Sequence, residues 1–142
     1  MTKAILGLAT AIVLLGTGCG TEKRLPTELD APSPDATFMR VQREVFTPQC
    51  AIPGCHGGAA SVAQEGMPLG EGLSYGAIVG VRSAQVPSLL RVAPFDPANS
   101  YLVRKITPGS FISGSPMPLG ASLTDAERRL VRDWVARGAP RD

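Results

Sequence analysis

Apolar side chains recur at helical spacing in several segments from residue 36 onward. No segment alternates apolar and polar residues as a half-buried strand would. The first helical pattern starts at residue 36. Asp35 is placed to cap this helix, and Pro48 is expected to end it just before Cys50. Its expected apolar stripe consists of Phe38, Val41, Val45 and Phe46.

The clearest helix is expected near the carboxyl end. Thr124 and Glu127 form the capping-box pattern T-x-x-E, and Gly138 is a stop signal. Trp134 is expected to pack against the first helix at Phe46 and Val45. The apolar face of this last helix consists of Leu130, Val131, Trp134 and Val135.

Two weaker helical segments lie between these elements. One is expected over residues 73–81, and the other over 96–106, where Asp96 would be the N-cap and Pro97 would stand in the first turn. A long Gly/Pro/Ser loop then covers 107–120. The pattern predicts a small all-α domain with few helices and long loops.

The amino-terminal segment has the pattern of an export signal. A positive charge at Lys3 precedes an apolar run too short to span a bilayer, which predicts a signal peptide over 1–18. The run ends on Cys19, which resembles the lipidated cysteine of bacterial lipoproteins; a chance cysteine beside an ordinary cleavage site is the alternative. The resemblance implies a lipid anchor on the periplasmic side of a membrane, and Gly20 in place of Asp favours the outer membrane.

Residues 19–35 then read as a lipidated cysteine and a flexible tether. The segment TEKRLPTELDAPSPD contains three prolines and few large apolar residues, and its extended length is about 45 Å. The remaining residues, 36–142, are expected to form one domain.

Composition bounds what this domain can do. The formal net charge of +2 falls to +1 once the signal with Lys3 is removed, which is too small to indicate a nucleic-acid partner. Sixteen Gly, 13 Pro and only 5% aromatic residues leave little material for a self-sufficient core. A bound group could supply the missing apolar volume.

The segment CAIPGCH carries the candidate chemistry. It contains Cys50 and Cys55, and His56, the only histidine of the chain, directly follows Cys55. The resulting C-x₄-C-H spacing is wider than the C-x-x-C-H signature of haem c attachment. Pro53 and Gly54 can form a turn that accommodates the extra residues. A disulfide, a zinc site lacking its fourth ligand, and a catalytic Cys–His pair are the other interpretations.

The flanking residues resemble a known family. FTPQCAIPGCHGG, followed by LVRKI, PMPLG and LTDAERRLVRDWVARGAP, is similar to small exported class I cytochromes c with a widened haem motif. The resemblance covers roughly residues 36–140. It implies a cytochrome c-like domain wrapped around one covalent haem c, with electron transfer to redox partner proteins as its function. It does not imply an enzyme, and a monomer is expected.

In that family a loop methionine binds the iron opposite the histidine. Met67 and Met117 both stand in the tetrapeptide MPLG. Met117 is the predicted ligand because it lies between two prolines in the loop before the last helix, which suits a stiff strap. Met39 is expected to pack on the first helix.

Arg91 and Tyr101 are the candidate donors to haem propionates, with Arg104 and Lys105 as further candidates. Solvated surface charge is the alternative for each of them. Two other functions stay open: a haem-free lipoprotein held by a Cys50–Cys55 disulfide, and a haem sensor or peroxidase with an open distal site. The second needs a distal acid–base group, although the only histidine is already used.

Overall fold

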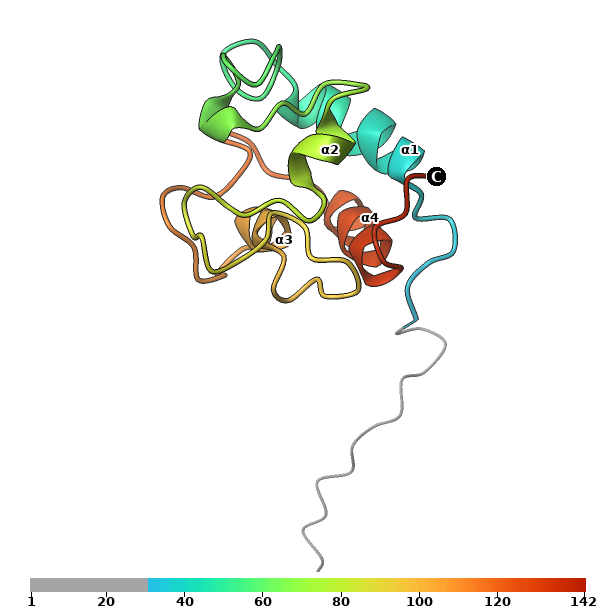
Figure 1. Ribbon diagram of the computed structural model, residues 1–142. Coiled ribbons are helices and arrows are strands. Elements are labelled where there is room, and N and C mark those ends of the chain that lie inside the picture. Colours follow the sequence, from blue (N-terminus) through green and yellow to red (C-terminus); the bar gives the residue numbers. More distant parts are fainter. Residues whose placement is uncertain (1–30) are drawn as a thin grey trace, which may run out of the picture.

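The structure is a computed structural model that describes residues 31–142 (Figure 1). The predicted signal peptide, Cys19 and most of the tether lie outside the described residues. Within 31–142 the chain forms helices joined by long loops, and the β-type pairing is confined to isolated bridges such as Val79 with Val92. The helical class expected from the sequence is confirmed at this level.

The first helix is continuous but changes its geometry along its length. It begins as the α-helix α1 (Phe38–Val41) and continues as the π-helix η2 (Gln42–Cys50). The remaining elements are the 3₁₀ turn η3 (Gln64–Gly66) and the helices α2 (Ser74–Ile78), α3 (Tyr101–Ile106) and α4 (Asp125–Ala136).

Both predicted ends of the first helix are wrong. The N-cap is Thr37, whose Oγ1 accepts a hydrogen bond from the Arg40 amide at 3.2 Å, because the chain is still extended at Thr37. The helix also continues through Pro48 to Cys50. Pro48 has no amide hydrogen to donate. In a π turn, which is wider than an α turn, the carbonyl left without this donor is that of Arg43, and Arg43 is exposed to solvent.

The start of α3 also differs from the prediction. Asp96 accepts a hydrogen bond from the Asn99 amide at 3.1 Å, so it caps a separate turn. The helix begins only at Tyr101 because Ser100 stays extended, with its hydroxyl donating to the Asp96 carbonyl at 2.8 Å. The helix expected over 73–81 is shorter as well and is confined to α2.

α4 confirms its prediction closely. The Glu127 amide donates to Thr124 Oγ1 at 3.2 Å, and the Thr124 amide donates to Glu127 Oε2 at 2.7 Å, which completes the capping box. The chain leaves the helix at Gly138, whose φ of +98° lies in the left-handed region that favours glycine. The expected face, Leu130, Val131, Trp134 and Val135, is buried.

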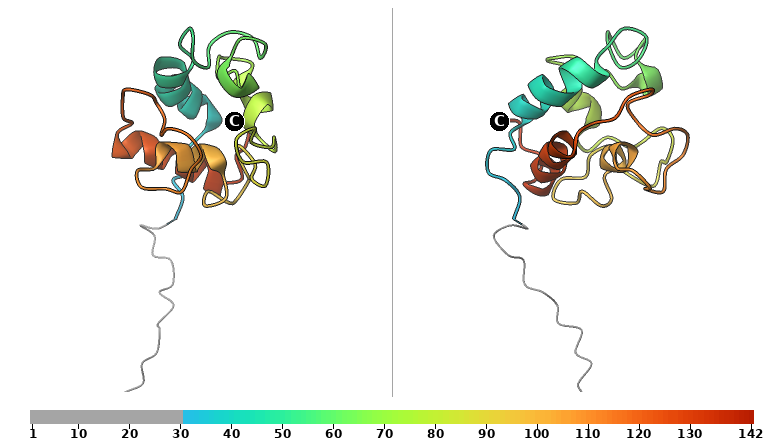
Figure 2. Two further views of the ribbon diagram at one scale, coloured as in Figure 1. Left: turned by 90° about the vertical axis from the view of Figure 1, so that its left-hand side faces the viewer. Right: turned by 180° about the vertical axis from the view of Figure 1, so that it is seen from behind.

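The core forms where α1 packs across α4 (Figure 2). The Phe38 ring lies 5.4 Å from the Trp134 ring and 5.1 Å from the Tyr75 ring, centroid to centroid. Trp134 belongs to the same buried cluster as Val45, in line with the expected packing. Met39 is 67% exposed, so its predicted packing role is wrong.

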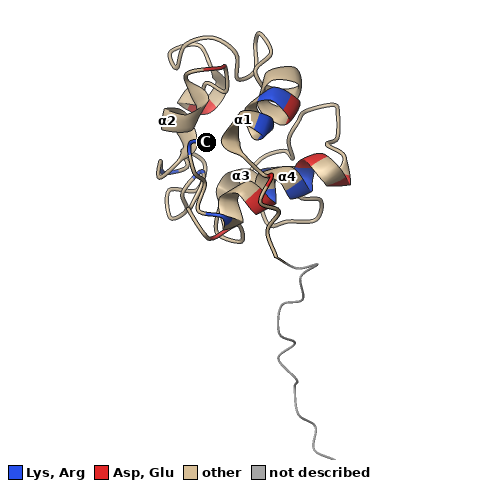
Figure 3. Ribbon diagram, turned by 90° about the vertical axis from the view of Figure 1, so that its right-hand side faces the viewer, with Lys and Arg blue, Asp and Glu red and all other residues tan. Residues whose placement is uncertain are grey.

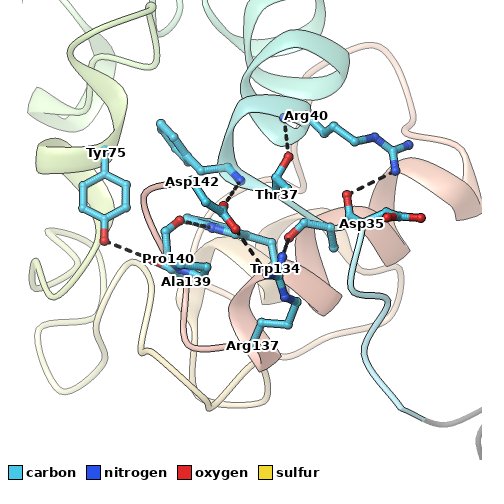
Figure 4. A network of polar contacts seen from close by, with 11 residues as sticks. Asp35, Thr37, Arg40, Tyr75, Trp134, Arg137, Ala139, Pro140 and Asp142 are labelled. Atoms are coloured by element: carbon cyan, nitrogen blue, oxygen red, sulfur yellow. Dashed lines mark hydrogen bonds and ion pairs between the residues drawn. The ribbon is translucent and has the colours of Figure 1, made fainter.

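The residues after α4 return to the start of α1 (Figure 4). The Phe38 amide donates to Asp142 Oδ1 at 2.8 Å, and Arg137 donates to the Ala36 carbonyl at 2.7 Å and to Asp142 Oδ2 at 3.2 Å. Tyr75 on α2 donates to the Ala139 carbonyl at 3.0 Å. This closing segment therefore holds α1, α2 and α4 together.

Candidate cofactor site

A cavity opens between η2, the loop that follows it, α3 and the loop before α4. It is small, with a volume of about 80 Å³, and it is partly open to solvent. Most of the wall is apolar. Its main hydrophobic side chains are Val45, Phe46, Leu69, Leu102, Ile106 and Val131.

The fold brings most of the predicted site residues to this cavity. The wall includes Cys50, His56, Met117, Arg91 and Tyr101, all of which the sequence singled out. These five residues come from four separate parts of the chain. Cys50 lies on η2 and Tyr101 on α3, and the other three come from the connecting loops.

Cys55 stands directly before His56 and is half-buried, but it is not part of the cavity wall. Both Cys50 and Cys55 are free thiols. The extra residues between them form the expected turn: the Cys55 amide donates to the Ile52 carbonyl at 3.1 Å, with Gly54 at a φ of +82°. The widened spacing is thus accommodated by one closed turn.

The histidine is buried and its ring is oriented by the backbone. His56 is 7% exposed, and its Nδ1 lies 3.0 Å from the Met67 carbonyl oxygen. A carbonyl only accepts hydrogen bonds, so Nδ1 carries the proton. Nε2 of the neutral ring is then the nitrogen with a free lone pair, and this is the form of histidine that binds metals.

Burial also sets the state of the first cysteine. It raises the pKa of the Cys50 thiol to about 11, with smaller electrostatic contributions from Glu127 and Cys55. The free thiol is therefore neutral near pH 7, which disfavours a nucleophilic or zinc-binding thiolate. Among residues 31–142, no group of three or more His, Cys, Asp or Glu side chains is placed to hold a metal ion.

The two MPLG copies hold different parts of the site. The Met67 carbonyl accepts from His56, and two residues further on the Leu69 amide donates to the His56 carbonyl at 2.8 Å. The Met117 amide instead donates to the Lys105 carbonyl at 2.8 Å. Both methionine side chains line the cavity. One copy therefore supports the histidine, and the other is attached to α3.

Two side chains of α3 hold the loop that carries Met117. Lys105 is 8% exposed, and its Nζ donates to the carbonyls of Ser113 at 2.7 Å and Ser115 at 2.8 Å. The Tyr101 hydroxyl accepts from the Ser113 amide at 2.9 Å. Tyr101 and Lys105 are four residues apart, so they share one face of the helix. That spacing could have indicated the role of Lys105, which the sequence marked only as a candidate propionate donor.

The four candidate propionate donors divide by position. Arg91, Tyr101 and Lys105 line the cavity, whereas Arg104 does not. The Arg91 guanidinium donates to the Ala77 carbonyl at 2.8 Å, and burial lowers the pKa of Arg91. Arg104 is engaged elsewhere and donates to the Ala98 carbonyl at 2.7 Å.

Sequence patterns missed one buried polar residue beside the site. Gln42 is 7% exposed within the apolar face of the first helix. Its Nε2 donates to the Leu69 carbonyl at 2.9 Å, and its Oε1 accepts from the buried hydroxyl of Ser74. A glutamine four residues after Phe38 and next to Val41 interrupts the apolar stripe of the first helix. This interruption was the signal in the sequence that could have pointed to Gln42.

In comparisons with known proteins, no family model, curated protein or solved structure matches this chain. Its function is therefore inferred from its own residues. None of the helices in 31–142 has the length and apolar character needed to cross a membrane.

Proposed function

We propose that this chain is an exported monohaem c-type cytochrome that transfers electrons. Cys50 and Cys55 would hold one haem c covalently, with His56 and Met117 as the two axial ligands. The domain would be a class I cytochrome c-like fold in which the described helices and loops surround the haem. Cys19 would carry the lipid that anchors the protein on the periplasmic side of a membrane, the outer membrane in preference to the inner.

One observation carries this proposal. His56 is oriented through Nδ1 by a backbone carbonyl at the wall of a largely apolar cavity that also contains a methionine on a separate, anchored loop. An imidazole and a thioether are the axial pair typical of electron-transfer cytochromes c. The neutral Cys50 thiol and the turn before Cys55 are compatible with two thioether links. The residues present therefore fit this cofactor.

The geometry favours Met117 over Met67 as the second ligand. The two ring nitrogens of His56 point in diverging directions, so a group bonded to Nδ1 lies on the side of the ring that faces away from a metal at Nε2. The Met67 carbonyl occupies that side. Met67 is thus engaged through its backbone on the Nδ1 side of His56, whereas Met117 reaches the cavity from a separate loop attached to α3 and would be the methionine that holds the iron.

Haem would supply the one-electron redox chemistry, and the protein would supply its environment. His56 and Met117 would set the ligand field, and the apolar wall would exclude water. Arg91 and Tyr101 are the proposed partners of the propionates, and Lys105 lies beside them. No side chain is proposed to act as an acid or base on a substrate, so the protein would not be an enzyme.

Redox partner proteins are the proposed partners, and the protein would act as a monomer without binding nucleic acid. The arginines of α4 do not form a purely basic surface: Arg128 pairs with Asp125, and Arg132 with Asp133 at 3.1 Å. Figure 3 shows basic and acidic residues side by side on α4. Docking is therefore expected to depend less on a single-sign patch than on the exposed edge of the cofactor.

The test begins with haem staining after denaturing electrophoresis of the chain produced in a host that attaches haem c. A stained band supports a covalent haem. An unstained band, with a Cys50–Cys55 disulfide found by mass spectrometry, would establish the haem-free lipoprotein instead.

The second step compares Met117→Ala with Met67→Ala. Only Met117→Ala should abolish the optical signature of methionine bound to ferric haem. If both variants and the unchanged protein lack this signature and react with peroxide, the sensor or peroxidase alternative holds. If Met67→Ala alone abolishes it, the ligand assignment is wrong.

A further inference from the structure

Gln42 is the central member of a buried hydrogen-bonded network. Its amide contacts three groups: the Leu69 carbonyl at 2.9 Å, the Thr47 hydroxyl at 3.1 Å and the hydroxyl of Ser74. Ser74 is fully buried on α2. A polar side chain in an apolar core is costly unless its hydrogen bonds are satisfied, and here they are. The network therefore joins η2, α2 and the segment around Leu69.

That segment is the one that orients His56. The Leu69 amide donates to the His56 carbonyl at 2.8 Å, and the Met67 carbonyl lies 3.0 Å from His56 Nδ1. Gln42 binds the opposite side of the same short stretch, at the Leu69 carbonyl. The helix that ends in Cys50 is thus connected, through one amide, to the backbone that holds the histidine ring.

We propose that Gln42 is a positioning residue for His56. It fixes the 67–69 backbone so that the Met67 carbonyl stays aligned with Nδ1 and Nε2 stays directed to the metal. The inference rests on the proposed haem function, because the orientation of His56 has a redox consequence only when iron is bound. Ser74 supports Gln42 by holding its Oε1, and its effect is smaller because the bond from Gln42 to Leu69 remains without it.

The consequence can be given a sign. A hydrogen bond from Nδ1 makes Nε2 a more basic ligand, and a more basic ligand stabilises ferric iron more than ferrous iron. Loosening the Met67 carbonyl should therefore raise the midpoint potential. If losing this partner weakens the preference for ferric over ferrous iron tenfold, the potential rises by about 59 mV.

The experiment uses the haem-loaded full chain and three variants: Gln42→Leu, Ser74→Ala and Val135→Ala. Val135 is fully buried but is not part of the cavity wall, so it is the matched control for destabilisation of the core. Two quantities are measured, the midpoint potential and the solvent exchange rate of the His56 Nδ1 proton by nuclear magnetic resonance.

Gln42→Leu should raise the potential by about 59 mV, the tenfold equivalent, and should speed exchange of the ring proton. Ser74→Ala should move both in the same direction by less. Val135→Ala should lower the melting temperature and leave both unchanged. If Gln42→Leu cannot be recovered folded, Ser74→Ala decides. Unchanged values in the network variants, or an equal shift in Val135→Ala, would overturn the inference.

Absence of haem is a separate outcome. If the wild-type chain stains negative, the proposed function fails, and the ring of His56 is read in the haem-free chain by ¹⁵N spectra. The positioning role then requires the Nδ1-protonated ring in the wild type and its loss in Gln42→Leu. Identical ring spectra in the two proteins would overturn the inference even there.

Discussion

Replacing Lys105 by leucine is expected to release the loop that carries Met117. The ammonium group of Lys105 donates to two loop carbonyls, those of Ser113 and Ser115. The loop also keeps the bond from the Met117 amide to the carbonyl of residue 105, which the substitution does not remove. The change should therefore weaken the attachment of the loop without unfolding the domain.

The magnitude follows from these contacts. Hydrogen bonds made by charged groups contribute about 1.5–3 kcal/mol each. Two facts reduce their sum. Burial partly desolvates the ammonium group and thereby lowers the pKa of Lys105. Ser113 and Ser115 are exposed, so water can replace the lost donor. A net loss of about 2 kcal/mol is expected, which corresponds to about a 30-fold change in an equilibrium constant.

The assay rests on the proposed haem and is titration of the ferric protein with imidazole. If Met117 is the second ligand, imidazole can bind the iron only after Met117 has left. The apparent affinity for imidazole is scaled by the fraction of molecules in which the loop has released the iron. Lys105→Leu should therefore lower the apparent dissociation constant of imidazole by about 30-fold. Arg104→Leu is the matched control, since Arg104 is the adjacent cation on α3 and does not line the cavity. It should titrate like the wild type.

Equal dissociation constants for Lys105→Leu and the wild type would refute this reasoning. They would mean either that the two carbonyl contacts do not restrain the loop or that Met117 is not the group displaced. A Met117→Ala protein separates these explanations, because it should bind imidazole tightly whatever residue stands at 105.

Three further outcomes are expected. Gly138→Ala should lower the free energy of unfolding in urea by about 1–2 kcal/mol because of its left-handed φ of +98°; Gly72→Ala, left-handed in open space, should cost a similar amount, since the Phe95 ring that a Cβ at Gly138 would overlap is 75% exposed and can turn away. Hydrogen bonds, chiefly from Arg40, lower the pKa of Glu44 from 4.5 to about 2. The stability that this shift provides is present above pH 4.5 and is lost as the pH falls through 2. Glu44→Gln should therefore flatten the acid unfolding curve between pH 4.5 and 2. The chain with both motif cysteines changed to serine and no haem should be largely unfolded, and a cooperative near-native melting curve by circular dichroism would contradict this.

The helices that could be predicted from the sequence are those fixed by neighbouring residues. The capping box of α4 and its apolar stripe lie within one short segment, and both are found as expected. Helix ends were missed where two signals competed. Thr37 and Asp35 can both cap, and Ser100 takes the position expected of Asp96, because tertiary packing rather than local propensity selects between such residues.

The same distinction between local signals and tertiary contacts applies to the residues of the candidate site. His56 and Met117 could be proposed from the sequence because they stand in short strings with their own chemistry, and both line the cavity. The roles of Gln42 and Lys105 were not predicted, although each had a weak signal in the sequence, because these roles depend on partners 27 and about ten residues away that only the folded chain brings close. Pro48 was expected to end its helix because the rule assumes an α turn, and the π geometry of η2 removes that assumption.

The contacts between the closing segment and the start of α1 affect the order in which the chain can fold. The amide of Phe38 finds its acceptor on Asp142, which lies 104 positions later in the chain. Synthesis proceeds from the amino end, and a contact this distant carries a large loop-closure cost. The segment Cys50–His56 is therefore made well before the residues that complete α1. During that interval the motif lies in an unfinished chain, open to modification before the core closes over it.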